Sequence, residues 1–311
     1  MKCLIVGCGY VGLPLGVELI RQGHEVVGLR RSTSAENELK ASGIKPLVAD
    51  ITKPDELARL PREFDWVIHC VSSTGGDVED YRQAYLQGTR NLIGWLATSP
   101  PKKFVYTGST SVYGQTDGSQ VKETSPTEPV AETGKILLET EKVLLGNSGS
   151  RLRGEDAATT VQARGLSPHQ KVPAVILRVA GIYGPGRGHW FKQFLKNEAR
   201  IEGDGSRFRN MIHRDDLIGC IIAALKNGRP GEIYNAVDDE PVSQANFFQW
   251  LAATVGKYPP PSVPENVEEN RKRGVTNKRV LNRRLKMELG YQFKYPNFRK
   301  GYTAEILRLV W

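Results

Sequence analysis

The 311-residue sequence has no long apolar run, no internal repeat and only four cysteines. No stretch approaches the roughly 18 apolar residues that a membrane-spanning helix needs, which excludes a helical membrane protein. The cysteines, Cys3, Cys8, Cys70 and Cys220, show neither CxxC spacing nor a partner histidine pattern. This excludes a zinc site and a disulfide framework and predicts reduced thiols in a cytoplasmic protein without a metal.

The start of the chain has only a superficial likeness to a secretory signal. Lys2 precedes an apolar stretch, but Gly7, Gly9 and Gly12 interrupt that stretch. No small-residue cleavage site follows. We therefore expect the N-terminal segment to be part of the mature fold.

The composition is that of an ordinary globular chain, with 39% hydrophobic and 25% charged residues and a mean hydropathy of -0.39. Its length predicts one large domain or two small ones. The 43 Lys and Arg exceed the 34 Asp and Glu, for a net charge of +9, which favours phosphate-bearing ligands. The basic residues are scattered and no nucleic-acid motif accompanies them, so we expect a nucleotide or phosphorylated small molecule rather than a polynucleotide.

Short apolar runs alternate with amphipathic segments, which is typical of a parallel sheet wound with helices. The pattern predicts helices at residues 13–22, 81–96 and 134–145 and strands at 2–7, 24–29, 44–49, 65–71, 102–108 and 173–181. The predicted fold class is α/β, a doubly wound (Rossmann) sheet with a smaller C-terminal lobe. We expect a dinucleotide-binding domain over residues 1–184 and a substrate lobe over 185–311, with segments around 205–240 returning to the sheet.

A polar segment at residues 146–171 separates the predicted helix at 134–145 from the next strand. It is much longer than such connections normally are. Its Gly- and Ser-bearing composition predicts an insertion that is dispensable for folding. The functional alternative is a lid or a partner-binding loop.

A GxGxxG motif follows the first predicted strand and precedes the first predicted helix, formed by Gly7, Cys8, Gly9, Tyr10, Val11 and Gly12. In this context Gly7 allows a tight turn and Gly9 lets the backbone approach a pyrophosphate. Gly12 allows close packing of helix and strand. The motif predicts a dinucleotide site, and the alternative is a purely structural glycine turn.

The end of the second strand predicts the cofactor preference. The acidic residue that would bind an NAD ribose is missing there, and Arg30, Arg31 and Ser32 stand in its place. A pair of guanidinium groups can hold a 2′-phosphate, so we expect NADP, with NAD as the alternative. The alternative interpretation is that both arginines are solvated surface residues that bind no ligand.

Three further residues complete the expected cofactor site. Asp50 and Ile51, after the third strand, are placed to contact adenine, although an acidic residue there is often only a turn former. Val71, at the end of the fourth strand, is included in the same site.

Five segments in order carry a family resemblance: residues 88–92 (GTRNL), 105–114 (VYTGSTSVYG), 177–188 (LRVAGIYGPGRG), 213–217 (HRDDL) and 282–291 (NRRLKMELGY). Together they resemble the extended short-chain dehydrogenase/reductases, the NAD-dependent epimerase/dehydratase family. The resemblance implies a Ser/Thr, a Tyr and a Lys beside a nicotinamide, with the Tyr as general acid or base. Ser109 matches the Ser/Thr position. Lys135 matches the Lys, which also holds the cofactor ribose.

The matching tyrosine is missing, because Ala131 stands four residues before Lys135. A methyl group transfers no proton, which makes the chain an atypical member of the family. Tyr183, with His189 near it, is the expected substitute, and packing is its alternative role. Glu132 is a further candidate base, otherwise a favourable partner of the helix dipole.

Several other polar residues can be interpreted either as structural or as functional residues. His69 lies in an apolar strand and is expected to be a buried core histidine. Arg187 and the cluster Arg271, Lys272 and Arg273 are candidate clamps for a phosphorylated substrate, or else a solvated basic face.

The predicted function is an NAD(P)-binding oxidoreductase or epimerase/dehydratase-like protein that acts on a phosphorylated or nucleotide-sugar-like substrate. The alternative is a non-catalytic NADP(H) sensor. The opening also resembles nucleotide-sugar dehydrogenases, but these need a nucleophilic cysteine, and Cys220 lies in an apolar helix. A homodimer is compatible with these features.

Overall fold

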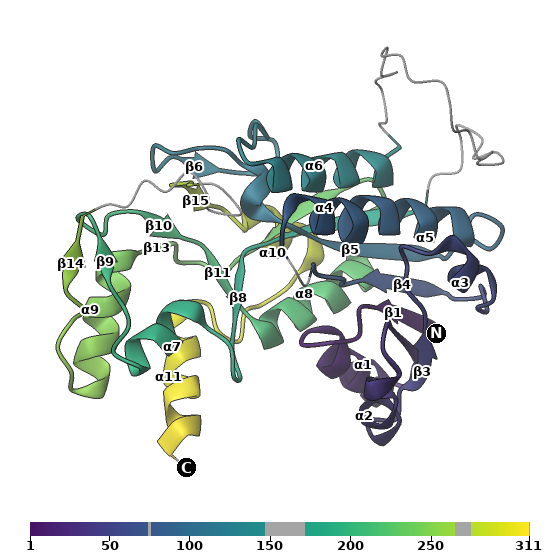
Figure 1. Ribbon diagram of the computed structural model, residues 1–311, viewed down its shortest axis with the longest axis horizontal. Helices are drawn as coiled ribbons and strands as arrows, with labels where there is room; N and C mark the ends of the chain where they lie inside the picture. The colour runs from purple at the N-terminus through teal and green to yellow at the C-terminus, as the bar shows by residue number, and fades with distance from the viewer. Residues whose placement is uncertain (74–75, 147–171, 265–274, 311) are drawn as a thin grey trace. The chain divides into compact units, whose positions relative to one another are not determined.

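The computed structural model describes residues 1–73, 76–146, 172–264 and 275–310 (Figure 1). The segment expected to be an insertion lies, apart from Gly146, outside the described residues. In the described part of the chain, no helix is long and apolar enough to cross a membrane.

A seven-stranded sheet has the order β12-β7-β5-β4-β1-β2-β3. The strands are β1 (Lys2–Val6), β2 (Glu25–Arg30), β3 (Lys45–Val48), β4 (Trp66–His69), β5 (Lys103–Ser109), β7 (Ala174–Val179) and β12 (Ile233–Ala236). The neighbours of β1 pair with it in parallel, Leu4 opposite Val27 on one side and Val67 on the other. The predicted doubly wound sheet is confirmed, including a strand within residues 231–237 that pairs with β7.

Burial explains why the strands read as continuous apolar runs. Every residue of β4 and β7 is buried, and so are four of the five residues of β1. Strands of a parallel sheet that are covered on both faces have no solvent side, so polar residues do not alternate with apolar ones.

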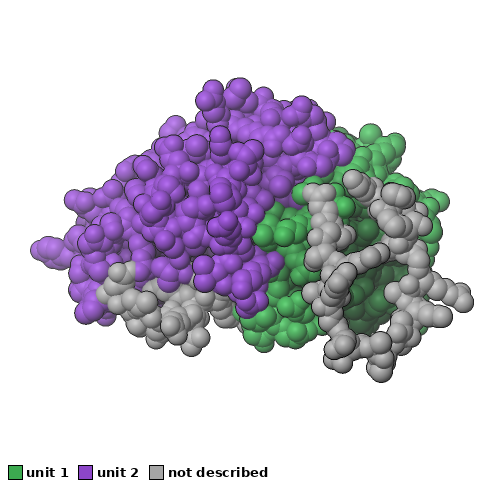
Figure 2. Space-filling model, turned by 90° about the horizontal axis from the view of Figure 1, so that it is seen from above, with its two compact units in different colours: residues 1–106, 136–175 green, residues 107–135, 176–311 purple. Residues whose placement is uncertain are grey.

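The chain divides into two compact units (Figure 2). Unit 1 comprises residues 1–106 and 136–175, and unit 2 comprises residues 107–135 and 176–311. The expected boundary at residue 184 differs from this division, because residues 107–135 and 176–184 belong to the unit that contains the C-terminal lobe.

Unit 1 has the layers of a wound sheet. Helices α1 and α2 lie on one face of the strands, and α4 and α5 on the other (Figure 1). Its helices are α1 (Gly12–Arg21), α2 (Glu36–Ala41), α3 (Pro54–Ala58), α4 (Val78–Tyr81), a π-helical turn (Arg82–Gln87), α5 (Gly88–Leu96) and all but the first turn of α6 (Glu132–Leu144).

Unit 2 combines short strands with helices around an aromatic core. The core includes Tyr183, Phe191, Phe247, Phe298 and Tyr302. Its helices are α7 (His189–Leu195), α8 (Arg214–Asn227), α9 (Gln244–Val255), α10 (Arg283–Leu289) and α11 (Phe298–Val310). Its short strands are β6 (Gln120–Val121), β8 (Gly181–Tyr183), β9 (Ile201–Glu202), β10 (Phe208–Arg209), β11 (Met211–His213), β13 (Val242–Ser243), β14 (Ser262–Val263) and β15 (Arg279–Val280).

Candidate functional site

The glycine-rich turn after β1 packs closely against the end of β4. Gly7 has φ +85°, and a Cβ on it would lie 2.7 Å from the backbone nitrogen of Val71. A Cβ on Gly12 would lie 2.8 Å from the carbonyl oxygen of Gly7. Both glycines are therefore required by the fold itself. Val71 lies against the glycine-rich turn, and its contact with a cofactor stays a prediction.

Gly9 is different, because a Cβ built on it meets no atom within 4 Å. The fold alone does not require a glycine there, whereas a ligand that approaches the backbone would. Helix α1 begins three residues later with the uncharged Gly12, Leu13 and Pro14. Backbone N–H groups at a helix N-terminus attract anions, so this turn fits a dinucleotide pyrophosphate.

Arg30 extends from the end of β2 over the glycine-rich turn. Its Nη1 donates to the carbonyl oxygen of Cys8 at 3.2 Å and lies 3.5 Å from the Oε2 of Glu38. This ion pair is partly exposed, which keeps its contribution to stability small. Arg31 is exposed, and Ser32 caps the following turn by accepting from the Ser34 N–H. Arg30 therefore lies beside the glycine-rich turn, and its contact with a 2′-phosphate stays a prediction.

Asp50 and Ile51 have local structural partners. One carboxylate oxygen of Asp50 accepts from the N–H and the hydroxyl of Thr52, at 2.9 and 2.8 Å. Ile51 is 4% exposed, and its carbonyl oxygen accepts from Asn91 at 2.9 Å. These bonds hold the loop after β3, and the adenine contact of the two residues stays a prediction.

His69 is a core residue, as expected. Its ring is fully buried, and Nε2 lies 2.9 Å from the hydroxyl oxygen of Thr89. Burial lowers the pKa of this histidine to about 3. Burial likewise raises the pKa of the Cys8 thiol to about 12 and that of Cys220 well above its ordinary value, which leaves both thiols unreactive.

Unit 2 brings the segments of Ser109 and Lys135 together. Ser109, at the end of β5, accepts hydrogen bonds from the N–H and the hydroxyl of Ser111. A Cβ on Gly134 would lie 3.1 Å from the carbonyl oxygen of Ser111. The first turn of α6 therefore packs on the turn that carries Ser109.

Ala131 directly precedes α6, and the loss of the family's tyrosine at this position stays a prediction. Its carbonyl oxygen accepts from the Lys135 N–H at 3.1 Å, so the two residues are one helical turn apart. The Nζ of Lys135 donates to Glu132 at 2.6 Å, and both side chains are about half exposed. Glu132 is thus engaged with Lys135.

Tyr183 has the contacts of a packing residue, which argues against the catalytic role expected for it. It is 1% exposed and stacks on Tyr302 with ring centroids 4.4 Å apart. A Cβ on Gly301 would lie 2.0 Å from its hydroxyl oxygen. Burial raises the pKa of this phenol far above its ordinary value, the reverse of what proton exchange at neutral pH needs.

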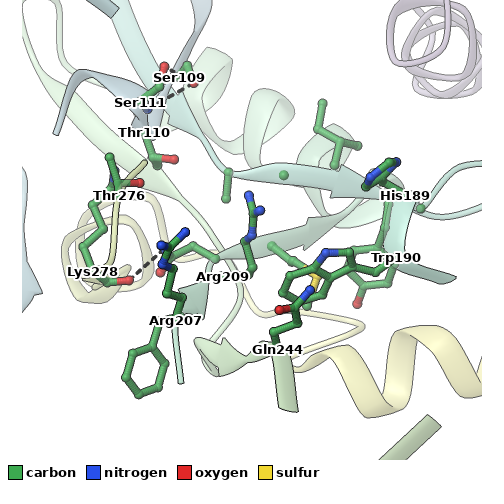
Figure 3. A pocket seen from close by; sticks show the side chains of 18 of the residues that line it. Ser109, Thr110, Ser111, His189, Trp190, Arg207, Arg209, Gln244, Thr276 and Lys278 are labelled. Atoms are coloured by element: carbon green, nitrogen blue, oxygen red, sulfur yellow. Dashed lines mark hydrogen bonds between the residues drawn. The ribbon is translucent and has the colours of Figure 1, made fainter. Parts of the chain in front are cut away.

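A pocket of about 360 Å³ lies within unit 2 (Figure 3). Ser109, Thr110 and Ser111 lie at one end, and His189 and Trp190 lie at the other. Further lining residues are Val179, Ala180, Gly181, Ile182, Tyr183, Gly188, Glu202, Arg207, Phe208, Arg209, Asn210, Met211, Gln244, Val275, Thr276, Lys278 and Tyr302.

The charged side chains of this pocket are mostly basic. Arg207, Arg209 and Lys278 face one acidic residue, Glu202, whose carboxylate lies 3.8 Å from Arg207. Low-dielectric walls lined by one sign of charge concentrate ligands of the other sign. The pocket can therefore hold an anionic small molecule.

These three cations were not predicted from the sequence. Arg187 was expected to act as a clamp, but it is not among the described residues that line the pocket. The cluster of residues 271–273 lies outside the described residues. Arg207 and Arg209 lie shortly before the HRDDL motif at residues 213–217, which is the one sequence signal near them, and no motif marks Lys278.

The chain is similar to known proteins over nearly its whole length. A sequence profile of the NAD dependent epimerase/dehydratase family matches residues 3–135. The protein YeeZ of Escherichia coli K12 is 28% identical over 303 residues, which are 95% of this chain and 97% of YeeZ. UDP-glucuronic acid 4-epimerase from Bacillus cereus, solved with UDP-glucuronic acid and NAD, is 22% identical with a TM-score of 0.79 over 100% of both chains, which shows the shared fold.

A structure from Methylobacillus flagellatus carries the family assignment. That protein, provisionally assigned as an NAD-dependent epimerase/dehydratase, is 30% identical, with a TM-score of 0.73. The match covers 100% of this chain and 99% of that one. The glycine-rich turn, the wound sheet and this likeness agree, and the chain belongs to the NAD-dependent epimerase/dehydratase family.

Proposed function

We propose that this chain is a cytoplasmic, NADP-preferring oxidoreductase or epimerase/dehydratase-type enzyme that acts on a phosphorylated or nucleotide-sugar-like small molecule. The observation that carries the proposal is the basic pocket of unit 2, which has Ser109 at one end. Arg207, Arg209 and Lys278 supply positive charge there, and Glu202 is the acidic residue that lines it.

The glycine-rich turn and Arg30 support the cofactor part of the proposal. Gly9 leaves room for a pyrophosphate above the N-terminus of α1, and Arg30 lies over the same turn. Charge-assisted hydrogen bonds from a guanidinium suit a 2′-phosphate better than a hydroxyl group. When bound, a nicotinamide cofactor supplies hydride exchange, which is the typical chemistry of the family.

The residues of unit 2 support the substrate part. Arg209 lies 5.1 Å from the centre of the Trp190 ring, which keeps the guanidinium along the pocket wall. The volume of about 360 Å³ is within the range of small-molecule sites. The B. cereus epimerase of the same fold was solved with UDP-glucuronic acid, and a nucleotide sugar carries the negative charge that this pocket suits.

The experiment combines binding with turnover. Calorimetric titration of the protein with UDP tests the anion site. A panel of carbonyl compounds and nucleotide sugars tests turnover, by the absorbance of NADPH for net reduction and by chromatography of the products for epimerisation or dehydration. We expect UDP binding that weakens with added salt, together with turnover of at least one anionic compound. UDP binding that is undetectable at low salt would remove the substrate part of the proposal.

Ala131 favours a second function, a dinucleotide sensor that retains the cofactor site without proton transfer. A sensor binds NADPH but converts no compound of the panel, whether turnover is followed by NADPH absorbance or by chromatography of the products. It also loses NADPH affinity in Lys135→Ala, because a ribose contact of Lys135 does not depend on turnover. The turnover measurement therefore separates the sensor from the enzyme.

A further inference from the structure

Lys278 is a buried amine on the wall of the basic pocket. The residue is 3% exposed, and its Nζ donates to the carbonyl oxygen of Tyr113 at 2.7 Å. An ammonium group has three N–H donors, so this bond uses one of them. In the described part of the chain, no carboxylate lies within ion-pair distance of this amine.

The environment of Lys278 favours the neutral amine. Burial lowers the pKa of Lys278 to about 8, and the positive charge of Arg209 adds to the effect. The other charged or titratable groups that line the pocket are Arg207, Glu202, His189, Tyr183 and Tyr302. An amine that titrates close to neutral pH can both give and accept a proton.

The backbone around Lys278 is held on both sides. Strand β15 pairs in parallel with β6, with Arg279 opposite Gln120. The carbonyl oxygen of Lys278 accepts from the side chain of Asn210 at 3.0 Å, and Asn277 accepts from the Phe208 N–H at 3.0 Å. A side chain on such a fixed element keeps its position during a reaction.

Lys278 is also tied to the turn that bears Ser109. Tyr113, whose carbonyl oxygen accepts from Lys278, donates its own N–H to Thr110 at 3.2 Å and so closes that turn. The first turn of α6, which Ala131 directly precedes, packs on the same turn through Gly134 and Ser111. Within unit 2, the Lys278 amine and the helix start next to Ala131 therefore both contact the turn that bears Ser109.

We propose that Lys278 is the catalytic residue that exchanges a proton with the substrate oxygen in this pocket, the task that the tyrosine performs elsewhere in the family. The inference rests on the proposed function. In reduction, the Lys278 ammonium would give its proton to the substrate carbonyl oxygen while the carbonyl carbon takes the hydride that a bound reduced nicotinamide would supply. The carbon–oxygen π bond breaks, C–H and O–H bonds form, and the amine is left neutral. In oxidation, the neutral amine removes the hydroxyl proton as the hydride leaves carbon for the oxidised nicotinamide.

Lys278→Arg separates proton exchange from anion binding, because arginine keeps the positive charge but does not titrate at accessible pH. We expect kcat to fall by about 10² to 10⁴ with the substrate found in the panel, while UDP still binds. The control is Lys286→Arg, which changes an exposed lysine paired with Asp239. Turnover of Lys278→Arg at the wild-type rate, or a wild-type pH profile of kcat without an ionisation near the pKa of about 8, would overturn the proposal.

Chemical labelling gives a readout that needs no turnover. Wild-type protein is acetylated with acetic anhydride over a neutral to alkaline pH series, and each lysine is followed by mass spectrometry. We expect Lys278 to react with a midpoint near its pKa of about 8, below the ordinary lysine value of 10.5, and UDP to slow its reaction. A midpoint at the ordinary lysine value, or labelling unaffected by UDP, would contradict the proposal. The UDP titration separates the proposed substrate site from the proposed role of Lys278. Wild-type protein that fails to bind UDP contradicts the substrate site itself, whereas the labelling result concerns Lys278 alone.

Discussion

The guanidinium of Arg30 donates to the carbonyl oxygen of Cys8 at 3.2 Å and so joins the end of β2 to the glycine-rich turn. In the proposed function the N-terminus of α1 binds a pyrophosphate, and the arginine adds a positive charge beside that turn. This single contact connects the two sequence features from which an NADP site was predicted.

Arg30→Ala should weaken NADPH binding at least tenfold and leave NADH binding almost unchanged. The lost charge-assisted hydrogen bond to a 2′-phosphate is worth about 1.5–3 kcal/mol, and NADH has no such phosphate. Fluorescence titration with both cofactors measures the change. Arg21→Ala is the matched control, because Arg21 is exposed and pairs with Glu18 on α1. Equal losses for the two cofactors would show that Arg30 acts on the turn rather than on the phosphate.

Gly7→Ala should lower the stability of the protein, whereas Gly9→Ala should lower its affinity for NADPH. At Gly7, the φ of +85° and the 2.7 Å approach to Val71 predict a loss of more than about 1 kcal/mol of unfolding free energy. At Gly9, the added methyl group meets no protein atom, so stability should hold while NADPH affinity falls. Thermal unfolding and cofactor titration of both variants test this pair. A destabilised Gly9→Ala variant with normal cofactor affinity would be inconsistent with a ligand above Gly9.

The pH dependence of stability should report on Lys278. Its pKa is about 8 in the folded chain and about 10.5 in the unfolded one, so between these values the unfolded chain binds more protons and the unfolding free energy rises with pH. Below pH 8 the buried charge is destabilising. Lys278→Met should therefore raise the unfolding free energy at neutral pH by about 2 kcal/mol, after the lost bond to Tyr113 is subtracted. Urea unfolding should show this gain shrinking as the pH rises, and a gain independent of pH would contradict the assignment.

Ala131→Tyr tests whether the family's phenol still fits. On the Lys278→Arg background, a tyrosine near Lys135 and Ser109 should restore turnover by about 10² or more, because general acid–base assistance is typically worth 10² to 10⁴. In the wild-type background we expect a smaller change, since Lys278 already exchanges the proton. NADPH absorbance in the four combinations measures both effects. If the folded double variant is no more active than the folded Lys278→Arg variant, a residue other than Lys278 exchanges the proton.

The fold was predictable because its signals are local. The buried strands β1, β4 and β7 are continuous apolar runs, and the glycine motif has its meaning between a strand and a helix that each follow from sequence pattern. The core role of His69 followed in the same way, from its apolar neighbours in β4.

The pocket could not be predicted in this way, because it depends on pairings between distant segments. Lys278 is buried because β15 pairs with β6 and because Asn210 binds its carbonyl group. No local pattern marks these contacts. Tyr183 is the converse case, since its place after a strand suggested a site residue, whereas Gly301 and Tyr302 in the last helix enclose it.

The most direct test of the account is a titration of the wild-type protein with NADPH and with NADH under identical low-salt conditions. The account predicts that both cofactors bind and that NADPH binds at least tenfold more tightly, through Arg30 and the glycine-rich turn. Equal dissociation constants, tighter binding of NADH, or no binding of either cofactor would contradict it.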